Sequence, residues 1–291
     1  MALDQVDVDK LDSKGRGEMS FMDHLESLRW HILRAFLAVM AGAAIVFMAK
    51  DFVFDKIIFG PKHADFPTYR ILCSWGEALC FSPPTFEIIT RDMGEKMNTH
   101  LVVSFMMGVI VAFPYIFWEF WRFISPGLYD KERKAAKGIV FICSLLFMIG
   151  VCFGYFVIAP FSIAFLAGYE LAGTTTTATL SSYVDYLVMF TIPIGLVFEM
   201  PVVAYFLAKL GVVTADFLRQ YRRIAFVVIL IVAGIITPPD VVSQIIVQIP
   251  LYSLFEASIF VAARVEKRKK AQQLIDDALE LEEENSSEQT T

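Results

Sequence analysis

Polar side chains inside long apolar stretches are the residues of this sequence whose types could do chemistry. Glu199 lies in the segment Val-Phe-Glu-Met-Pro, two residues before Pro201. Gln244, Gln248 and Glu256 recur at helical spacing in a later apolar stretch. An ionisable group within a membrane is costly and marks a candidate functional site. Glu199 could contact a substrate, or it could bond to backbone groups freed by Pro201. The later stripe could be functional, or it could form hydrogen bonds between helices.

Acidic and basic residues also cluster at the ends of two apolar stretches. The cluster His-Leu-Glu-Ser-Leu-Arg ends at Arg29 and contains Glu26 and Ser27. The cluster Pro-Gly-Leu-Tyr-Asp-Lys-Glu-Arg contains Glu132. Such clusters are commonly solvated helix ends or internal ion pairs, and alternatively they bind a charged partner. Glu119, which stands among tryptophans, is expected to be an interfacial acid.

Signatures of catalysis, metal binding and nucleic-acid binding are absent from the sequence. No phosphate-binding loop G-x-x-x-x-G-K-[ST], no H-E-x-x-H motif and no nucleophile–base pair occurs, and the four histidines are scattered. No spacing of cysteine and histidine is typical of a metal site. The net charge of −6, without a basic stripe, argues against nucleic acid as a partner. We therefore expect a protein that is not an enzyme and has neither cofactor nor metal.

Composition indicates that membrane-spanning helices position these side chains. Of 291 residues, 56% are hydrophobic and 19% are charged, whereas a globular chain is about half apolar and a quarter charged. Crossing the hydrocarbon core of a bilayer takes about 20 apolar residues. Six segments reach or approach this length, at about 32–49, 101–121, 138–159, 185–209, 224–236 and 241–263. The sequence therefore predicts an all-α membrane protein with six transmembrane helices.

The predicted helices are uneven. The last two spans are short, since the uncharged stretch 224–239 would reach only about 24 Å as a helix. Proline removes an amide donor and bends a helix. Prolines lie inside or beside the spans at Pro114, Pro160, Pro193, Pro201 and Pro250. We therefore predict a bundle of kinked helices.

Lysine and arginine predict the orientation in the membrane. Nineteen of the 25 fall in segments on one side of the six spans, and the other six lie in the outer loop 50–97. Because positive residues favour the cytoplasmic side, both termini are predicted to be cytoplasmic. We expect a polar cytoplasmic segment at 1–20, a membrane domain at 21–264 and a charged tail at 265–291. The basic start of the tail should touch anionic lipid head groups, and its acidic end should be disordered.

Cys73 and Cys80 lie close together in the outer loop. On the oxidising side of a membrane they could form a disulfide bond that closes a short ring. The alternative is two unpaired thiols.

Taken in order, several segments resemble the TatC family, the multispanning subunit of the twin-arginine protein translocase. The resemblance covers about residues 20–264. Its motifs are D-H-L-x-x-L-R before the first span, F-W-x-F-x-x-P-G-L-Y-x-x-E-R ending at Arg133, F-E-x-P around Glu199 and T-P-P-D-x-x-S-Q around Asp240. It implies a receptor for signal peptides with paired arginines. Such a receptor is the core of a pathway, driven by the proton gradient, that exports folded proteins across the bacterial cytoplasmic membrane.

The resemblance also implies where the arginines bind. A guanidinium is always charged, and its planar fork pairs bidentately with carboxylates. The glutamate of the family's L-Y-x-x-E-R motif is Glu132 here, and we assign the main arginine contact to it. The family's other glutamate, two residues before Arg29, is replaced by Ser27. The nearest acid, Glu26, lies one helical step or about 100° away. Whether Glu26 or Ser27 serves as the second acceptor stays open.

Further positions and partners follow from the same resemblance. Glu199 matches the family's intramembrane acid, which would face a cavity for signal peptide or partner helices, and Gln244 on the last span is a further polar candidate for that cavity. Asp240 matches an acid in the outer turn between the last two spans, and Pro61 matches a proline of the first outward loop. The implied partners are twin-arginine signal peptides, single-span subunits of the TatA and TatB type, and membrane lipids, in an oligomeric complex.

A secondary transporter for a small solute is the alternative function. Glu199 would then be its proton or ion site near the middle of the membrane. Such carriers often consist of two matching halves, and no repeat between spans one to three and four to six is evident in the sequence.

Overall fold

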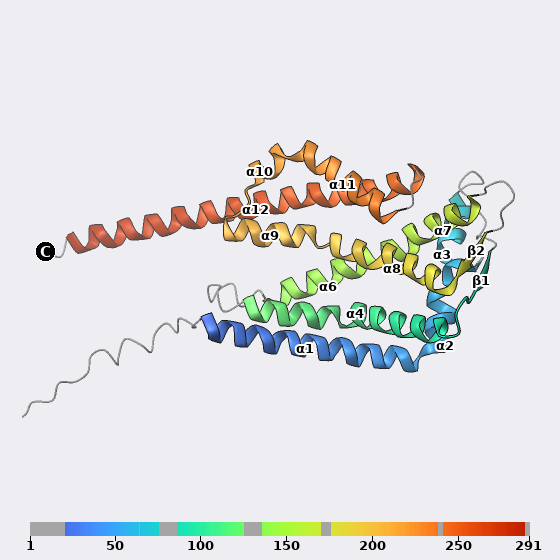
Figure 1. Ribbon diagram of the computed structural model, residues 1–291. Helices are drawn as coiled ribbons and strands as arrows, with labels where there is room; N and C mark the ends of the chain where they lie inside the picture. The colour runs from blue at the N-terminus through green and yellow to red at the C-terminus, as the bar shows by residue number, and fades with distance from the viewer. Residues whose placement is uncertain are drawn as a thin grey trace, which may run out of the picture.

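The computed structural model describes residues 21–63, 65–75, 86–124, 136–169, 176–237 and 241–288. Long helices dominate this part of the chain and run side by side as a bundle (Figure 1). They are α1 (Phe21–Met48), α4 (Glu95–Ile124), α6 (Ala136–Phe153), α7 (Ala159–Gly168), α8 (Leu180–Val197), α9 (Met200–Leu210), α11 (Arg222–Ile236) and α12 (Val241–Glu288). The prediction of an all-α membrane protein is confirmed.

Five helical segments of the described chain are long and apolar enough to cross a membrane. They are Leu25–Met48, Glu95–Phe123, Gly138–Gly168, Leu180–Leu210 and Ser243–Ile275. The helix at the predicted fifth span, α11, has 15 residues and packs along α12. It is short, as the sequence indicates, and the count of six spans stays a prediction.

Two of the predicted kinks coincide with breaks between helices. A π-helical turn, η7 (Gly154–Ile158), joins α6 to α7 just before Pro160. The chain also breaks between α8 and α9 at Glu199, and Pro201 then lies in the first turn of α9. Proline is well tolerated there because the first amides of a helix have no partner within it. The other three prolines lie within α4, α8 and α12.

Close packing of backbones holds the bundle together. A Cβ atom on Gly108 of α4 would lie 2.6 Å from the backbone nitrogen of Ala43 in α1. A Cβ atom on Gly154 of η7 would collide with the carbonyl oxygen of Phe190 in α8. Small residues permit this approach between helices in a membrane, where van der Waals packing replaces the hydrophobic effect. The central helix is α8, in which Phe190 and Ile194 are fully buried.

Short elements form a cap at one end of the bundle. The cap comprises α2 (Lys50–Phe52), the π-helical turn η3 (Val53–Ile58), the 3₁₀ turn η4 (Gly60–Lys62), α3 (Pro67–Trp75), β1 (Glu87–Ile89) and β2 (Thr177–Thr179). The two strands pair in parallel, with Glu87 opposite Thr177. The cap lies at the right of Figure 1, and the start of α1 lies at the opposite end of the bundle. The described parts of the predicted outer loop therefore fold into defined elements.

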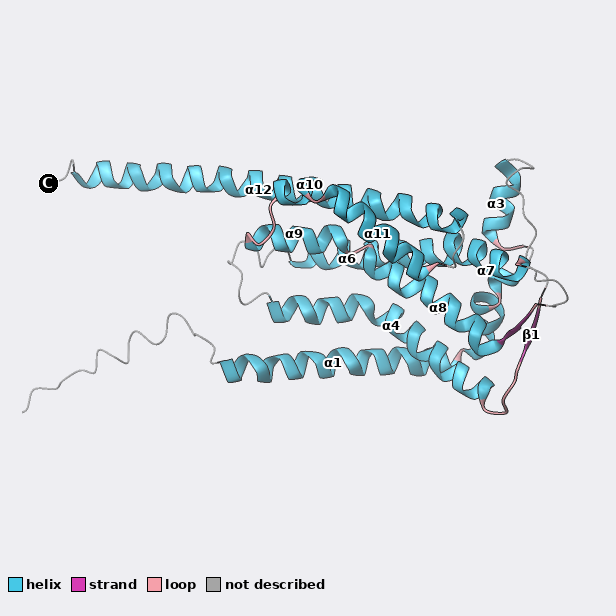
Figure 2. Cartoon of the chain, turned by 45° about the horizontal axis from the view of Figure 1, so that its top comes forward, coloured by secondary structure: helices cyan, strands magenta, loops and turns pink. Residues whose placement is uncertain are grey.

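Helix α12 continues far beyond the bundle, away from the cap (Figures 1 and 2). The sequence predicts disorder in the acidic end of the tail 265–291, whereas the described chain is helical to Glu288. The extension starts from a formed helix, so it avoids the cost of nucleation. It is rich in residues that favour helices, and Glu266 and Lys270 form an ion pair of 3.0 Å one turn apart. The short helix α10 (Ala215–Gln220) packs against α12.

Candidate functional site

The start of α1 carries the predicted residues for arginine recognition. Glu26 and Arg29 are exposed, whereas Ser27 is half-buried. Ser27 precedes His31 by one helical turn, and His31 contacts α4. Ser27 therefore lies on the side of α1 that faces α4, and Glu26 is rotated away from it by about 100°. Glu132 lies outside the described residues.

A buried carboxylate joins α1 to α4 one turn further along the helix. The Nδ1 atom of His31 lies 2.5 Å from Oε2 of Glu119, and the hydroxyl of Tyr115 donates to Oε1 at 2.8 Å. The side chain of Glu119 is only 3% exposed. The expectation of an interfacial acid did not include this partner, because His31 and Glu119 are 88 residues apart. The one feature of the sequence that could have indicated this contact is His31 itself, one helical turn after Ser27.

Glu199 is the most isolated acid of the described bundle. Its side chain is 7% exposed, and neither carboxylate oxygen makes a well-formed hydrogen bond within the described residues. Its contacts there are with the thiol of Cys143, which is a weak donor, and with the backbone of Phe147, both in α6. The amides of Val202 and Val203 bond instead to the backbone carbonyl of Glu199, at 3.0 Å each. The side chain therefore does not cap α9, contrary to the structural role considered from the sequence. A buried carboxyl group with only weak donors beside it is costly, which favours a role in contacting another molecule.

The polar stripe of α12 points to its neighbour α11. The amide of Gln244 donates to the backbone carbonyl of Leu230 at 3.3 Å, and Gln248 bonds to another carbonyl of α11. Glu256 accepts from the guanidinium of Arg222 at 2.6 Å. Since all three contacts run from α12 to α11, they support the interpretation of the stripe as hydrogen bonding between helices.

The cap contains several of the other predicted residues. Pro61 is fully buried, and its carbonyl accepts a hydrogen bond of 2.8 Å from the hydroxyl of Tyr69. Burial raises the pKa of Tyr69 to about 12, so this donor keeps its proton. Cys73 is disulfide-bonded. Cys80 and Asp240 lie outside the described residues, and the pairing of Cys73 with Cys80 stays a prediction.

A carboxylate that the sequence did not single out joins the start of α4 to α8 and to the loop after β1. Glu95, in the first turn of α4, accepts from the backbone amide of Arg91 at 2.6 Å. It also accepts from the amide and the hydroxyl of Ser181 in α8, both at 2.9 Å. Acids are favoured at helix N-termini, but the partner across the bundle could not be read from the sequence. This contact fixes the starts of α4 and α8 side by side.

Together, the bundle and its buried acids define a multispanning α-helical membrane protein. The family model described as "Sec-independent protein translocase protein (TatC)" matches residues 23–250. The chain belongs to the TatC family, whose members are translocase components and not enzymes.

Relatives and solved structures agree with this assignment. A TatC protein of Blattabacterium sp. subsp. Periplaneta americana is 37% identical over 262 residues, which are 87% of this chain and 98% of the relative. A TatC protein of Aquifex aeolicus is 33% identical, again over 87% of this chain and 98% of the relative. A crystal structure described as "Twin Arginine Translocase Receptor- TatC in DDM" is 32% identical. It matches with a TM-score of 0.66 over 82% of this chain and 99% of that chain.

Proposed function

We propose that this chain is the receptor subunit of a twin-arginine translocase and binds twin-arginine signal peptides where α1 begins. The observation that carries the proposal is the family match over residues 23–250, which includes the start of α1, Glu132 and Glu199. The solved relatives, which are described as twin-arginine translocase receptors, support it. A secondary transporter is not favoured, because these relatives match most of the chain.

Glu132 is the main acceptor for the paired arginines in this proposal, and a residue of α1 assists it. A carboxylate can bind a guanidinium through two charge-assisted hydrogen bonds. Two adjacent arginines call for more than one acceptor. At the start of α1, Ser27 can accept a hydrogen bond but cannot neutralise a charge. Glu26 carries a charge but is exposed.

The signal peptide and the partner subunits also meet the bundle at membrane depth. Glu199 is buried and has only weak contacts with α6 among the described residues, so it is able to accept a hydrogen bond from an incoming helix or peptide. We assign this role to it, with single-span subunits of the TatA and TatB type as partners. Gln244 lies on the neighbouring hairpin, and Pro61 and Asp240 belong to the outer face.

The protein lies in the bacterial cytoplasmic membrane as a multi-pass subunit with both termini in the cytoplasm. Its membrane domain covers residues 21–264, with the segment 1–20 before it and the tail 265–291 after it. The positive-inside distribution of lysine and arginine supports this orientation. The start of α1 and the far end of α12 also lie at the same end of the bundle (Figure 1).

Titration with a fluorescent twin-arginine signal peptide tests the main contact. We expect Glu132→Ala to weaken binding about 10- to 150-fold, since a hydrogen bond to a charged group contributes about 1.5–3 kcal/mol. Asp130→Asn removes a neighbouring negative charge at a variable position of the motif and should leave affinity unchanged. Equal affinities of Glu132→Ala and the parent protein would remove Glu132 from the site.

A further inference from the structure

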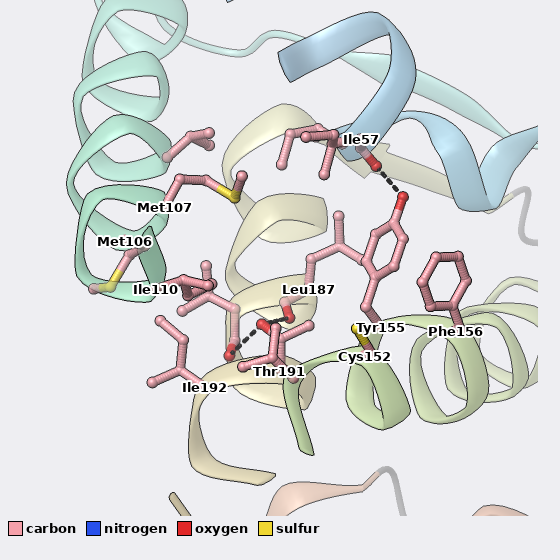
Figure 3. A pocket seen from close by; sticks show the side chains of 14 residues that line it. Ile57, Met106, Met107, Ile110, Cys152, Tyr155, Phe156, Leu187, Thr191 and Ile192 are labelled. Atoms are coloured by element: carbon pink, nitrogen blue, oxygen red, sulfur yellow. Dashed lines mark hydrogen bonds between the residues drawn. The ribbon is translucent and has the colours of Figure 1, made fainter. Parts of the chain in front are cut away.

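An apolar cavity of about 160 Å³ lies between α4, α8 and the two π-helical turns η3 and η7 (Figure 3). Met107, Ile110 and Leu187 are among the side chains that line it. The hydroxyl of Tyr155 is bonded to the carbonyl of Ile57 at 2.6 Å, and that of Thr191 is bonded within its own helix. Both hydroxyl groups of the lining are thus satisfied by backbone. An apolar cavity of this size stays dry and admits an apolar guest.

The cavity faces the surface that a bilayer would cover. Among its lining residues, Cys152 and Phe156 are exposed, and both belong to the segment Gly138–Gly168 that is apolar enough to cross a membrane. The α4 and α8 segments that complete the wall are also candidate membrane spans. A guest would therefore enter from the hydrocarbon phase.

A second, basic hollow of about 680 Å³ lies in the cap. Lys56, Lys62, Lys96 and His63 line it, and Asp55 is the one carboxylate in the described lining. Lys56 and Lys96 are exposed, and neither belongs to an ion pair of the described residues. Three lysines against one aspartate make this hollow complementary to an anion.

The cavity and the hollow are stacked along the same helices. On α4, Lys96 lines the hollow, and Val103 lines the cavity seven residues later. On α8, Leu180 lines the hollow, and Leu187 lines the cavity seven residues later. Seven residues are about two helical turns, so each pair shares a face and is separated by about 10 Å along the axis. In the cap, η3 contributes to both through neighbouring residues. The basic hollow thus lies about 10 Å from the apolar cavity, toward the cap.

We propose that an anionic glycerophospholipid binds here, with its phosphate in the basic hollow at Lys56 and Lys96 and one acyl chain in the apolar cavity. Clustered lysines beside membrane helices attract anionic lipid head groups, here in the leaflet on the side of the cap. The lipid would join the cap to α4 and α8 from the bilayer side. The site is separate from the arginine-binding site at the opposite end of the bundle, and Glu199 lines neither the cavity nor the hollow, so the proposal does not depend on the function proposed above.

Native mass spectrometry of the full chain, with added palmitoyl-oleoyl phosphatidylglycerol, tests the proposal. We expect Lys56→Gln and Lys96→Gln each to weaken retention of the lipid about fivefold, from the attraction of one lysine to an anionic lipid. Lys50→Gln, which removes an exposed charge of the cap outside the hollow, should change nothing. Ile192→Trp, which fills the cavity, should abolish retention, and Ile142→Trp on an exposed face of α6 should not. Phosphatidylcholine should be retained more weakly than phosphatidylglycerol.

Alkylation of Cys152 gives a readout that does not depend on whether the variants fold. Phosphatidylglycerol should slow its reaction with N-ethylmaleimide in the parent protein, while buried Cys143 stays unreactive throughout. Each of four results would overturn the proposal. The first is equal retention of both lipids. The second and third are loss of retention only in the lysine variants, or only in Ile192→Trp. The fourth is no protection of Cys152 by phosphatidylglycerol. If a second copy of the chain or a partner helix filled the cavity instead, added lipid would not change the reactivity of Cys152, which is the fourth result.

Discussion

The second acceptor for the paired arginines can be decided by two substitutions at neighbouring positions of α1. Glu26 is exposed, and an exposed ion pair contributes about 0.2–1 kcal/mol. We therefore expect Glu26→Ala to weaken binding of a twin-arginine signal peptide by no more than about fivefold. Ser27 is half-buried on the side facing α4, and a carboxylate there would be better shielded from water. Ser27→Glu should therefore strengthen binding, by about 1.5–3 kcal/mol or roughly 10- to 150-fold.

Peptide titration at low and high salt measures both effects. The gain from Ser27→Glu should shrink as salt rises, since it rests on charge. Ser27→Gln is the matched control, because glutamine has nearly the same shape as glutamate but carries no charge. It should give little gain in affinity. A loss above about tenfold from Glu26→Ala would show that the exposed acid serves as the acceptor. The register of α1 would then not determine which side chain accepts the arginine.

Three further predictions concern contacts in the helices and the cap. A double-mutant cycle on thermal unfolding in detergent measures the contact of His31 with Glu119. His31→Ala and Glu119→Gln should show a coupling free energy of about 1–3 kcal/mol. A value below about 0.5 kcal/mol would mean that the pair does not hold α1 against α4. Glu95→Gln should speed hydrogen exchange at the start of α8 more than at its end, because Ser181 loses a charged acceptor, and uniform exchange along α8 would contradict this role. Cys73 and Cys80 should not react with maleimide in denatured, unreduced protein, and reduction should lower stability by about 2–3 kcal/mol; full labelling of both without reductant would exclude the bond.

The buried acids show how far reasoning from the sequence reaches into the site. Glu199 could be singled out because a charged residue in an apolar stretch is conspicuous by itself. That its carboxylate finds only the weak donor Cys143 and the backbone of Phe147 could not be known, because this depends on which groups α6 brings around it. Gln244 was equally conspicuous, and the structure directs its amide to the backbone of α11. The same signal in the sequence therefore leads to two different environments.

The sequence by itself determines the class of the protein and most of its helices. A bilayer offers no water to unpaired backbone groups, so each apolar stretch of sufficient length must become a helix, and this requirement is local. The predicted spans at about 101–121 and 138–159 lie inside α4 and the α6–α7 segment accordingly. Tertiary structure alone decides which distant residues meet. The pairing of His31 with Glu119, the parallel contact of β1 with β2 and the bond from Ser181 to Glu95 join segments more than 80 residues apart. These contacts depend on how the helices pack, and no local pattern encodes them.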